Sequence, residues 1–215
     1  MKHYEETFST WNKIASLYQE KFMDLDLYNQ TYDTFCQLIK PRYADILEIG
    51  CGPGNITKHL LKQRTDFNIY GIDIAPNMIE LARLNNSKAH FEVMDARDIR
   101  ILNRTFDGMI CGFCLPYLSH QDGEKLIQDS SSLLRADGIL YISFVEGDPE
   151  LSSFQVGSSG DRTYFYFYRL KTLKAVLAKY KLRELETIHV NYPKTNGEID
   201  IHTIIIAQKN DSNFR

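Results

Sequence analysis

Three glycines alternate with other residues at positions 50, 52 and 54, directly after an apolar run in the stretch ILEIGCGPGN. Glycine adopts backbone conformations with positive φ, and it lacks the Cβ atom that keeps a ligand away from the main chain. A helical pattern of apolar residues follows at 56–61, and the first amides of a helix are free to bind a ligand. We therefore predict that Gly50, Gly52 and Gly54 form a strand-to-helix turn that holds a small molecule.

Acidic residues mark the first three apolar runs of this region. Glu48 precedes the glycines, Asp73 ends the next run about 20 residues further on, and Asp95 and Ala96 end the third. An acid at the spacing of Asp73 is placed to bind a ribose diol. A carboxylate at Glu48 disfavours a phosphate and favours a cation, and the dinucleotide fingerprint GxGxxG requires a glycine where this chain has Asn55. The pattern predicts an adenosine-containing ligand that carries positive charge.

Short apolar runs alternate with helical patterns from residue 45 onward, which predicts an α/β fold with a parallel sheet and helices on both faces. Ser119 with Asp122 three residues later predicts a helix start. Two β-rich runs at 185–192 and 198–207 flank Asn196-Gly197, a strong hairpin-turn signal. The strands that we expect before them lie at 45–49, 68–72, 90–94, 106–111 and 138–144.

The first forty residues have a different pattern. Apolar residues recur at spacings of three and four from Trp11 to Leu25 and again from Tyr28 to Ile39, which predicts two amphipathic helices. We expect an N-terminal helical cap at 1–40 and a catalytic domain at 41–215, which together form a single structural domain. The Ser- and Gly-rich stretch at 152–160 predicts a mobile loop.

Five blocks of the sequence carry a resemblance to a known family. They are EIGCGPG, GIDIAPNMIELA, VMDARD, FDGMIC and LLRADGILYIS, which together span about residues 45–145. In order and spacing they resemble class I S-adenosylmethionine-dependent methyltransferases of the small-molecule type. The resemblance implies a Rossmann-like three-layer sandwich with an N-terminal helical cap. Its seven-stranded, mostly parallel sheet would have the order 3-2-1-4-5-7-6, with the last strand antiparallel.

The resemblance also implies S-adenosylmethionine as cofactor, S-adenosylhomocysteine as product, and roles for individual residues. The glycine loop would wrap the methionine part, Glu48 would help to place its ammonium group, and Asp73 would hold both ribose hydroxyls. Adenine would lie between Ile74 or Met78 and the turn at Asp95 and Ala96. Tyr18 would reach the cofactor from the first helix, although an ordinary core position explains it equally well. The full set of expected cofactor contacts is Tyr18, Glu48, Gly50, Cys51, Gly52, Gly54, Asp73, Ile74, Met78, Asp95, Ala96 and Cys111. In this set Cys111, together with its neighbour Gly112, would flank the sulfonium.

Methyl transfer from a sulfonium is an in-line displacement at carbon, so alignment in a dry site is the main requirement and a base is optional. Weak candidates for such a base or for an acceptor contact are His120, Tyr117 and Tyr166. His120 is explained equally by the first turn of a surface helix. Tyr166 belongs to an alternation of tyrosine and phenylalanine at 164–168, which either walls the acceptor pocket or turns its tyrosines outward. We expect transfer to an O or N atom of an unidentified small molecule.

Composition limits the other classes of function. A formal net charge of −3 supplies no positive field for nucleic acid. No apolar run is long enough to span a membrane, and the first ten residues lack the apolar stretch of a signal peptide. The four cysteines are too few for a disulfide framework, and a cytoplasmic location is expected. We find no metal-ligand spacing and expect no metal.

Two other functions remain open at this point. One is a protein that binds S-adenosylmethionine without transferring its methyl group. The other is a nucleotide-linked oxidoreductase, which Asn55 disfavours. The sequence is compatible with a monomer or a homodimer.

Overall fold

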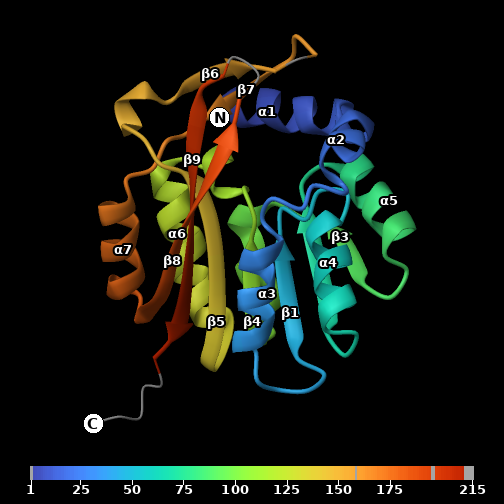
Figure 1. Ribbon diagram of the computed structural model, residues 1–215, viewed down its shortest axis with the longest axis vertical. Helices are drawn as coiled ribbons and strands as arrows, with labels where there is room; N and C mark the ends of the chain where they lie inside the picture. Colours follow the sequence, from blue (N-terminus) through green and yellow to red (C-terminus); the bar gives the residue numbers. More distant parts are fainter. Residues whose placement is uncertain (1, 158, 195–196, 211–215) are drawn as a thin grey trace.

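The computed structural model describes residues 2–157, 159–194 and 197–210 of the 215-residue chain. Its centre is a seven-stranded sheet in the order β3-β2-β1-β4-β5-β9-β8 (Figure 1). The first five strands run parallel, whereas β9 is antiparallel to both β5 and β8. The predicted sheet order and its antiparallel last strand are therefore confirmed. The strands are β1 (Asp45–Ile49), β2 (Asn68–Asp73), β3 (His90–Val93), β4 (Phe106–Cys111), β5 (Leu134–Val145), β8 (Leu182–Pro193) and β9 (Ile199–Lys209).

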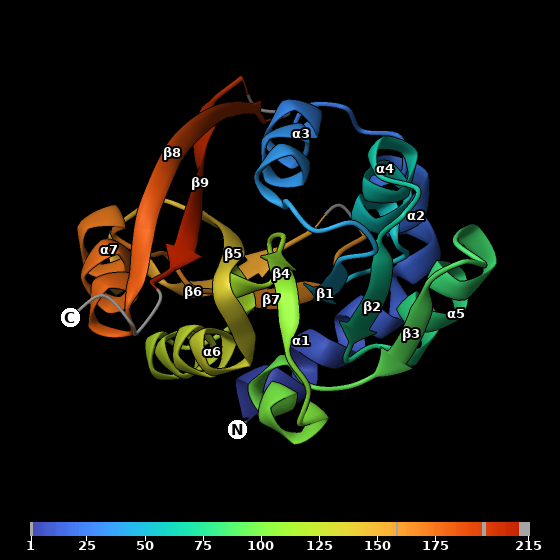
Figure 2. The same ribbon diagram turned by 90° about the horizontal axis from the view of Figure 1, so that it is seen from below.

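Helices cover both faces of the sheet (Figure 2). Helices α3 (Asn29–Leu38) and α4 (Asn55–Gln63) lie on one face, and α6 (His120–Leu133) and α7 (Leu170–Lys179) lie on the other. Successive side chains of a strand point to opposite faces. Ile46 accordingly packs in the core beneath α3 and α4, and Leu47 packs in the core beneath α6. Helix α5 (Pro76–Asn85) packs on β2 and β3 at the other end of the sheet.

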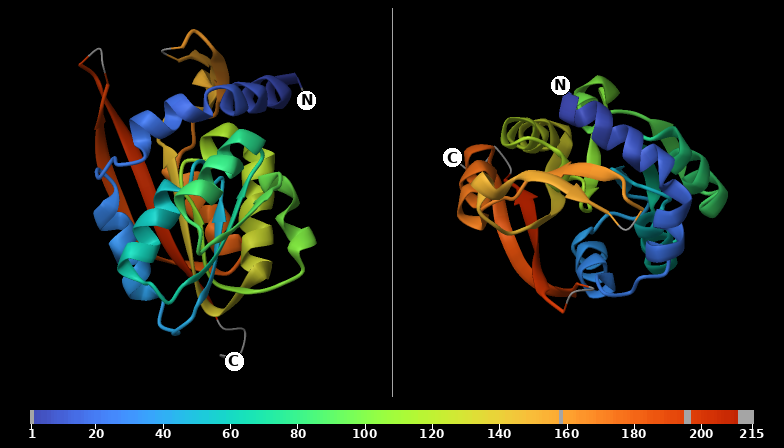
Figure 3. Two further views of the ribbon diagram at one scale, coloured as in Figure 1. Left: turned by 90° about the vertical axis from the view of Figure 1, so that its right-hand side faces the viewer. Right: turned by 90° about the horizontal axis from the view of Figure 1, so that it is seen from above.

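The N-terminal region contains three helices, not the two that the pattern predicted. The first predicted helix is interrupted at Ile14, which separates α1 (Lys2–Lys13) from α2 (Ala15–Phe22). Both helices run across the carboxyl ends of the parallel strands (Figure 3). The second predicted helix, α3, packs against the sheet beside α4, because its apolar stripe of Tyr32 and Phe35 is buried against β5.

A second, two-stranded sheet lies over α1 (Figure 3). Strands β6 (Ser153–Val156) and β7 (Arg162–Phe165) pair antiparallel across a short turn. The prediction of a loop at 152–160 was therefore wrong for residues 153–156. The local sequence signal for a strand is weak here, and contacts between the two strands stabilise it instead. The Phe154 ring packs edge-on against the Tyr164 ring, with 5.2 Å between ring centroids.

Several local predictions hold in the structure. The Ser119 hydroxyl accepts a hydrogen bond from the Asp122 amide at 3.1 Å, so the predicted cap begins α6. Strands β8 and β9 form the predicted C-terminal hairpin. Its turn includes Asn196, which lies outside the described residues, whereas Gly197 has the expected positive φ of 84°. Short 3₁₀ turns are η1 (Ala96–Leu102), η2 (Leu115–Tyr117) and η3 (Pro149–Leu151). Within the described residues no helix has both the length and the apolar character needed to cross a membrane.

Candidate functional site

The glycine turn joins β1 to α4, and its shape requires glycine. Gly50, Gly52 and Gly54 all have positive φ, at 68°, 53° and 82°. A Cβ atom on Gly50 would lie 2.7 Å from the Cβ of Cys114, and one on Gly54 would lie 2.4 Å from the side-chain nitrogen of Asn86. The positive φ angles agree with the prediction, and the turn brings bare backbone against neighbouring elements of the protein.

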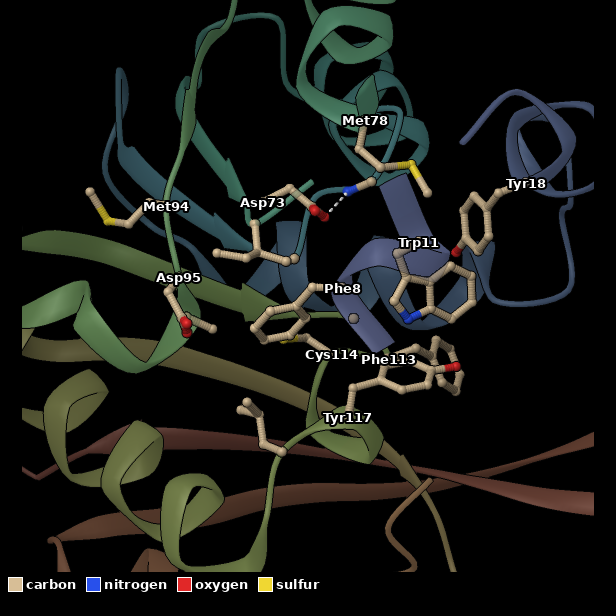
Figure 4. Close-up of a pocket in the computed structure, with 16 residues that line it drawn as sticks. Phe8, Trp11, Tyr18, Asp73, Met78, Met94, Asp95, Phe113, Cys114 and Tyr117 are labelled. Atoms are coloured by element: carbon tan, nitrogen blue, oxygen red, sulfur yellow. Dashed lines mark hydrogen bonds between the residues drawn. The ribbon is translucent and has the colours of Figure 1, made fainter. Parts of the chain in front are cut away.

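Asp73 connects this turn to the end of β2. Its carboxylate accepts hydrogen bonds from the amides of Gly52 and Ala75, each at 2.9 Å (Figure 4). Burial raises the pKa of Asp73, and the hydrogen bonds from these amides oppose that shift. The side chain thus holds the turn in place and also faces the cavity described below.

Glu48 lies behind the turn and is fully buried. The alternation of β1 places Glu48 on the same side as Ile46, beneath α4, where one carboxylate oxygen accepts a hydrogen bond from the Thr57 hydroxyl. The other oxygen, Oε1, has no hydrogen-bond partner among the described residues. Burial raises the pKa of Glu48 to about 8. Among the described residues, Glu48 lines neither the cavity at the glycine turn nor the second cavity that adjoins it.

The cofactor cavity, as we call it below, lies between the helical cap and the carboxyl edge of the sheet (Figure 4). Most of the residues that the sequence analysis selected line it, namely Tyr18, Gly50, Gly52, Asp73, Ile74, Met78, Asp95 and Ala96. The sequence analysis named Tyr117 as a candidate for catalysis and Gly112 as a neighbour of the sulfonium. It missed the rest of the wall, which consists of Phe8, Trp11, Met94, Phe113, Cys114 and Leu118.

Besides Glu48, three of the selected residues lie outside the cofactor cavity. Cys111 is fully buried in the core on the α6 side of the sheet, because it is the last residue of β4 and alternates with Ile110. Gly112, which was expected beside the sulfonium together with Cys111, lines the cofactor cavity along with Phe113 and Cys114. Gly54 caps α4 without lining a cavity, and Cys51 lines the second cavity only.

Asp95 follows β3 as the N-cap of η1, and its charge is balanced by a neighbouring cation. Its carboxylate forms an ion pair with Arg97, in which Nη2 and Oδ2 are 2.5 Å apart, and it also accepts the Arg97 amide at the start of η1. The Arg97 guanidinium stacks over the Tyr4 ring of α1 at 4.3 Å. This pair ties the cap to the edge of the cofactor cavity.

A second and larger cavity, of about 240 Å³, continues from the first. The two share Trp11, Tyr18, Phe113 and Tyr117 together with the glycine backbone. We call it the acceptor-side cavity. Its further walls are Phe22, Leu25, Tyr28, Tyr32, Cys51, Asn55, Ile56, Pro116, Val145, Phe165, Tyr192, Asp200 and His202.

Of the three weak candidates for catalysis, only Tyr117 lines a cavity among the described residues. Tyr117 lines both cavities. His120 begins α6, with its Nε2 atom 2.8 Å from the carbonyl oxygen of Phe167, and is not in the described lining. Tyr166 packs against the rings of His120 and Tyr164 and is likewise outside the lining. In the tyrosine–phenylalanine alternation it is Phe165 that faces the acceptor-side cavity.

His202 of β9 was assigned no function from the sequence. Its Nδ1 atom lies 2.7 Å from the Tyr28 hydroxyl, and its ring stacks on those of Tyr28 and Tyr192 at centroid distances of 5.9 and 4.8 Å. Burial lowers the pKa of His202 to about 4, against an opposing effect of Asp200. The imidazole is therefore neutral at pH 7. A single histidine inside an apolar strand gave no signal that could have identified it.

The described residues contain no group of three or more His, Cys, Asp or Glu side chains that could hold a metal ion. The cavities are lined mainly by aromatic rings, glycine backbone and the carboxylates of Asp73, Asp95 and Asp200. This composition suits an organic ligand with hydroxyl and amino groups.

Residues 46–138 match the family described as "Methyltransferase domain". This stretch contains the glycine turn, Asp73 and Asp95, and the match agrees with the resemblance to class I S-adenosylmethionine-dependent methyltransferases. A malonyl-[acyl-carrier protein] O-methyltransferase of Acetivibrio thermocellus is 39% identical over 103 residues, which are 46% of this chain and 35% of that relative. This match therefore spans about a third of the relative's length. An uncharacterized methyltransferase of Alkaliphilus oremlandii is 26% identical over 150 residues, 66% of this chain and 68% of the relative.

Solved methyltransferase structures share the fold. A methyltransferase from Methanosarcina mazei superposes with a TM-score of 0.69 at 20% identity, covering 81% of this chain and 96% of that one. The 1,6-didemethyltoxoflavin-N1-methyltransferase of Burkholderia thailandensis has a TM-score of 0.68 at 19% identity, with coverage of 95% and 87%. The family match at residues 46–138 ends before β6, β7 and the C-terminal hairpin.

Proposed function

We propose that the chain transfers the methyl group of S-adenosylmethionine to an O or N atom of a small molecule. The observation that carries this proposal is the cofactor cavity, where the glycine-rich turn after β1 meets the carboxylate of Asp73 and, after β3, that of Asp95. This arrangement matches a ligand with a ribose, an adenine ring and an amino acid end.

The residues present fit such a cofactor. Gly52 has a φ of 53°, and a Cβ atom there would point to Tyr18 at 3.6 Å and fill part of the space between turn and cap. Glu48 offers an oxygen without a partner just behind the turn, and a cationic amino group nearby would stabilise its charged form. Asp73 retains acceptor capacity for hydroxyl groups, since a carboxylate has about four lone-pair sites and the two amides use two of them.

We assign roles on this basis. Asp73 holds the ribose hydroxyls, and Gly50 and Gly52 offer backbone to the methionine part. Ile74 and Met78 on one side, and the turn at Asp95 and Ala96 on the other, hold adenine. Tyr18, which lines both cavities, closes the site from the cap. The bound cofactor supplies an electrophilic methyl carbon. The protein itself aligns the acceptor and excludes water through Trp11, Phe113 and Tyr117, the rings shared by the two cavities.

We also propose a division into a cap at 1–40 and a catalytic domain at 41–215, a small-molecule partner in place of nucleic acid, and a cytoplasmic location. The net charge of −3 supports the small-molecule partner. Free thiols at Cys36, Cys51, Cys111 and Cys114 support a reducing compartment.

Isothermal titration of the full chain tests the cofactor. We expect S-adenosylmethionine and S-adenosylhomocysteine to bind and NAD to bind at least tenfold more weakly. Tighter binding of NAD would reject the proposal in favour of a nucleotide-linked oxidoreductase. Incubation with methyl-labelled cofactor and a metabolite extract then tests transfer. Cofactor binding without any labelled product across extracts would indicate a binding protein without transferase activity.

A further inference from the structure

Aromatic rings from α1, α2, α3, β7 and β8 surround the acceptor-side cavity. Trp11 meets Tyr117 edge to face at 5.0 Å and Tyr18 at 5.6 Å, so these rings form a wall with fixed orientations. Phe165 of β7 packs edge-on against Tyr117 at 5.7 Å and extends this wall toward the hairpin. Such a cavity favours a flat guest that contacts ring faces and edges.

Positive charge is missing from the described lining of this cavity. No lysine or arginine occurs in it, and its only carboxylate is that of Asp200. The charge of Asp200 is itself paired with Lys194 at 3.2 Å, and Lys194 also pairs with Glu198 at 3.0 Å. A carboxylate or phosphate that entered the cavity would lose its hydration without gaining a counter-charge.

Neutral hydrogen-bonding groups do occur there. The indole Nε1–H of Trp11 is buried and has no partner among the described residues. The hydroxyl groups of Tyr18 and Tyr32 stay protonated because burial raises the pKa of both. The imidazole of His202 uses Nδ1 toward Tyr28 and has no described partner at Nε2. These groups can pair with one or two uncharged polar atoms of a guest.

The acceptor-side cavity adjoins the cofactor cavity, so these polar groups lie close to the proposed site of methyl transfer. Phe113 lines both cavities and also contacts the His202 ring at a centroid distance of 4.9 Å. One aromatic residue thus separates the imidazole from the cofactor cavity. A guest held by the aromatic walls therefore lies next to the space assigned to the cofactor.

We propose that the acceptor-side cavity selects a flat, uncharged aromatic compound that bears a hydroxyl or ring N–H group, and that it rejects acceptors carrying a carboxylate or phosphate. The inference rests on the proposed function, since it assigns this cavity to the methyl acceptor. Trp11 and the Tyr28–His202 pair are the polar contacts, and the rings of Phe165 and Tyr117 supply the stacking surface.

A matched pair of probes tests the selection. Binding of 2-naphthol and of 6-hydroxy-2-naphthoate is measured by isothermal titration to the full chain saturated with S-adenosylhomocysteine. We expect the neutral naphthol to bind and the carboxylate to bind at least tenfold more weakly. Equal or tighter binding of the carboxylate would overturn the proposal, and so would the absence of naphthol binding to a chain that does bind S-adenosylhomocysteine. Failure of S-adenosylhomocysteine itself to bind would instead remove the proposed function, and the acceptor assignment with it.

Variants locate the binding. Phe165→Ala removes a phenyl ring from the cavity wall. Phe167→Ala, two residues further along, makes the identical substitution outside the described lining. We expect naphthol affinity to fall at least fivefold in the first variant and to stay within twofold in the second, with S-adenosylhomocysteine affinity unchanged in both. Tyr192→Arg places a cation in the wall, and we expect it to raise the affinity for the carboxylate relative to that for naphthol. Equal effects of the two phenylalanine substitutions, or no gain for the carboxylate in Tyr192→Arg, would contradict the assignment.

Discussion

The backbone N–H of Gly52 donates a hydrogen bond of 2.9 Å to the carboxylate of Asp73, so the turn after β1 is fastened directly to the end of β2. The second carboxylate oxygen accepts the amide of Ala75 at the same distance. Asp73 therefore has two roles, because it shapes the cavity wall and presents its remaining lone pairs to the cavity. A substitution there affects both the turn and the ligand.

Asp73→Asn is expected to weaken binding of S-adenosylmethionine at least tenfold, or about 1.4 kcal/mol. The amide has one acceptor oxygen where the carboxylate has two, so it cannot serve both amides and the ribose hydroxyls. Titration calorimetry checks this, as does the fluorescence of Trp11, the chain's single tryptophan, which lines the cavity. The control is Asp98→Asn, an exposed acid of η1, which should leave affinity unchanged. Unaltered binding by Asp73→Asn would place the ribose elsewhere.

Gly54→Ala and Gly160→Ala separate backbone strain from steric conflict. Both glycines have φ near 80°, but a Cβ on Gly54 meets Asn86 at 2.4 Å, while nothing lies within 4 Å of one on Gly160. We expect Gly160→Ala to cost about 1 kcal/mol of unfolding free energy. Gly54→Ala should cost at least about 1 kcal/mol more, because Asn86 must give up its hydrogen bond to the Gly54 carbonyl. Urea denaturation measures both, and equal losses would show that Asn86 adjusts freely.

Glu48 should make the protein less stable as the pH rises. Its pKa is about 8 in the folded chain and near 4.5 when unfolded, so between these values the folded state binds more protons. Stability falls across this window by up to about 1.4 kcal/mol per pH unit. Glu48→Gln can still accept the Thr57 hydroxyl and should flatten the slope. Denaturant titrations from pH 5 to pH 8.5 compare the two proteins, and parallel curves would contradict the raised pKa.

His202 should make the protein less stable as the pH falls, which is the opposite direction to the effect of Glu48. Its folded pKa of about 4 lies below the ordinary 6.5, so the unfolded chain binds the extra proton and stability is lost as the pH falls from 6.5 toward 4. His202→Gln removes this loss while its amide can still pair with Tyr28. The direct measurement is an NMR titration of the histidine ring protons, in which the signal missing from His202→Gln should titrate near pH 4. A midpoint near 6.5 would refute the effect of burial.

The β6–β7 hairpin is held to the cap by threonines. The Thr7 hydroxyl accepts the Tyr164 amide at 2.9 Å, and the Thr10 hydroxyl donates to the carbonyl of Arg162 at 2.9 Å. Thr7→Val leaves that buried amide unpaired, at a cost of about 1 kcal/mol. We expect faster hydrogen exchange in β7 than in the wild type. Thr34→Val makes the same chemical change inside α3, where the hydroxyl bonds only its own helix, and should leave exchange in β7 unaltered.

The strands and the glycine turn could be predicted because their signals are local. Apolar runs of the right length, the Ser119 cap and the position of Asp73 at a strand end depend on residues close together in the chain. The break at Ile14 and the pairing of β6 with β7 could not be predicted from the sequence. A helix kink and the partner of a strand depend on what packs against them in the folded chain.

The amino-acid sequence by itself determined where the strands lie, the turn with Gly50, Gly52 and Gly54, and the acid at the end of β2, since backbone geometry and side-chain period are properties of short segments. The order of the strands in the sheet was expected only from the resemblance to a known family. The tertiary structure alone decided that Cys111 turns into the core while Phe113 and Cys114 face the ligand space, and that Trp11, Phe165 and His202 meet around one cavity. These residues come from segments far apart in the chain, and only the packing of the cap, the hairpin and β9 over the same sheet edge brings them together.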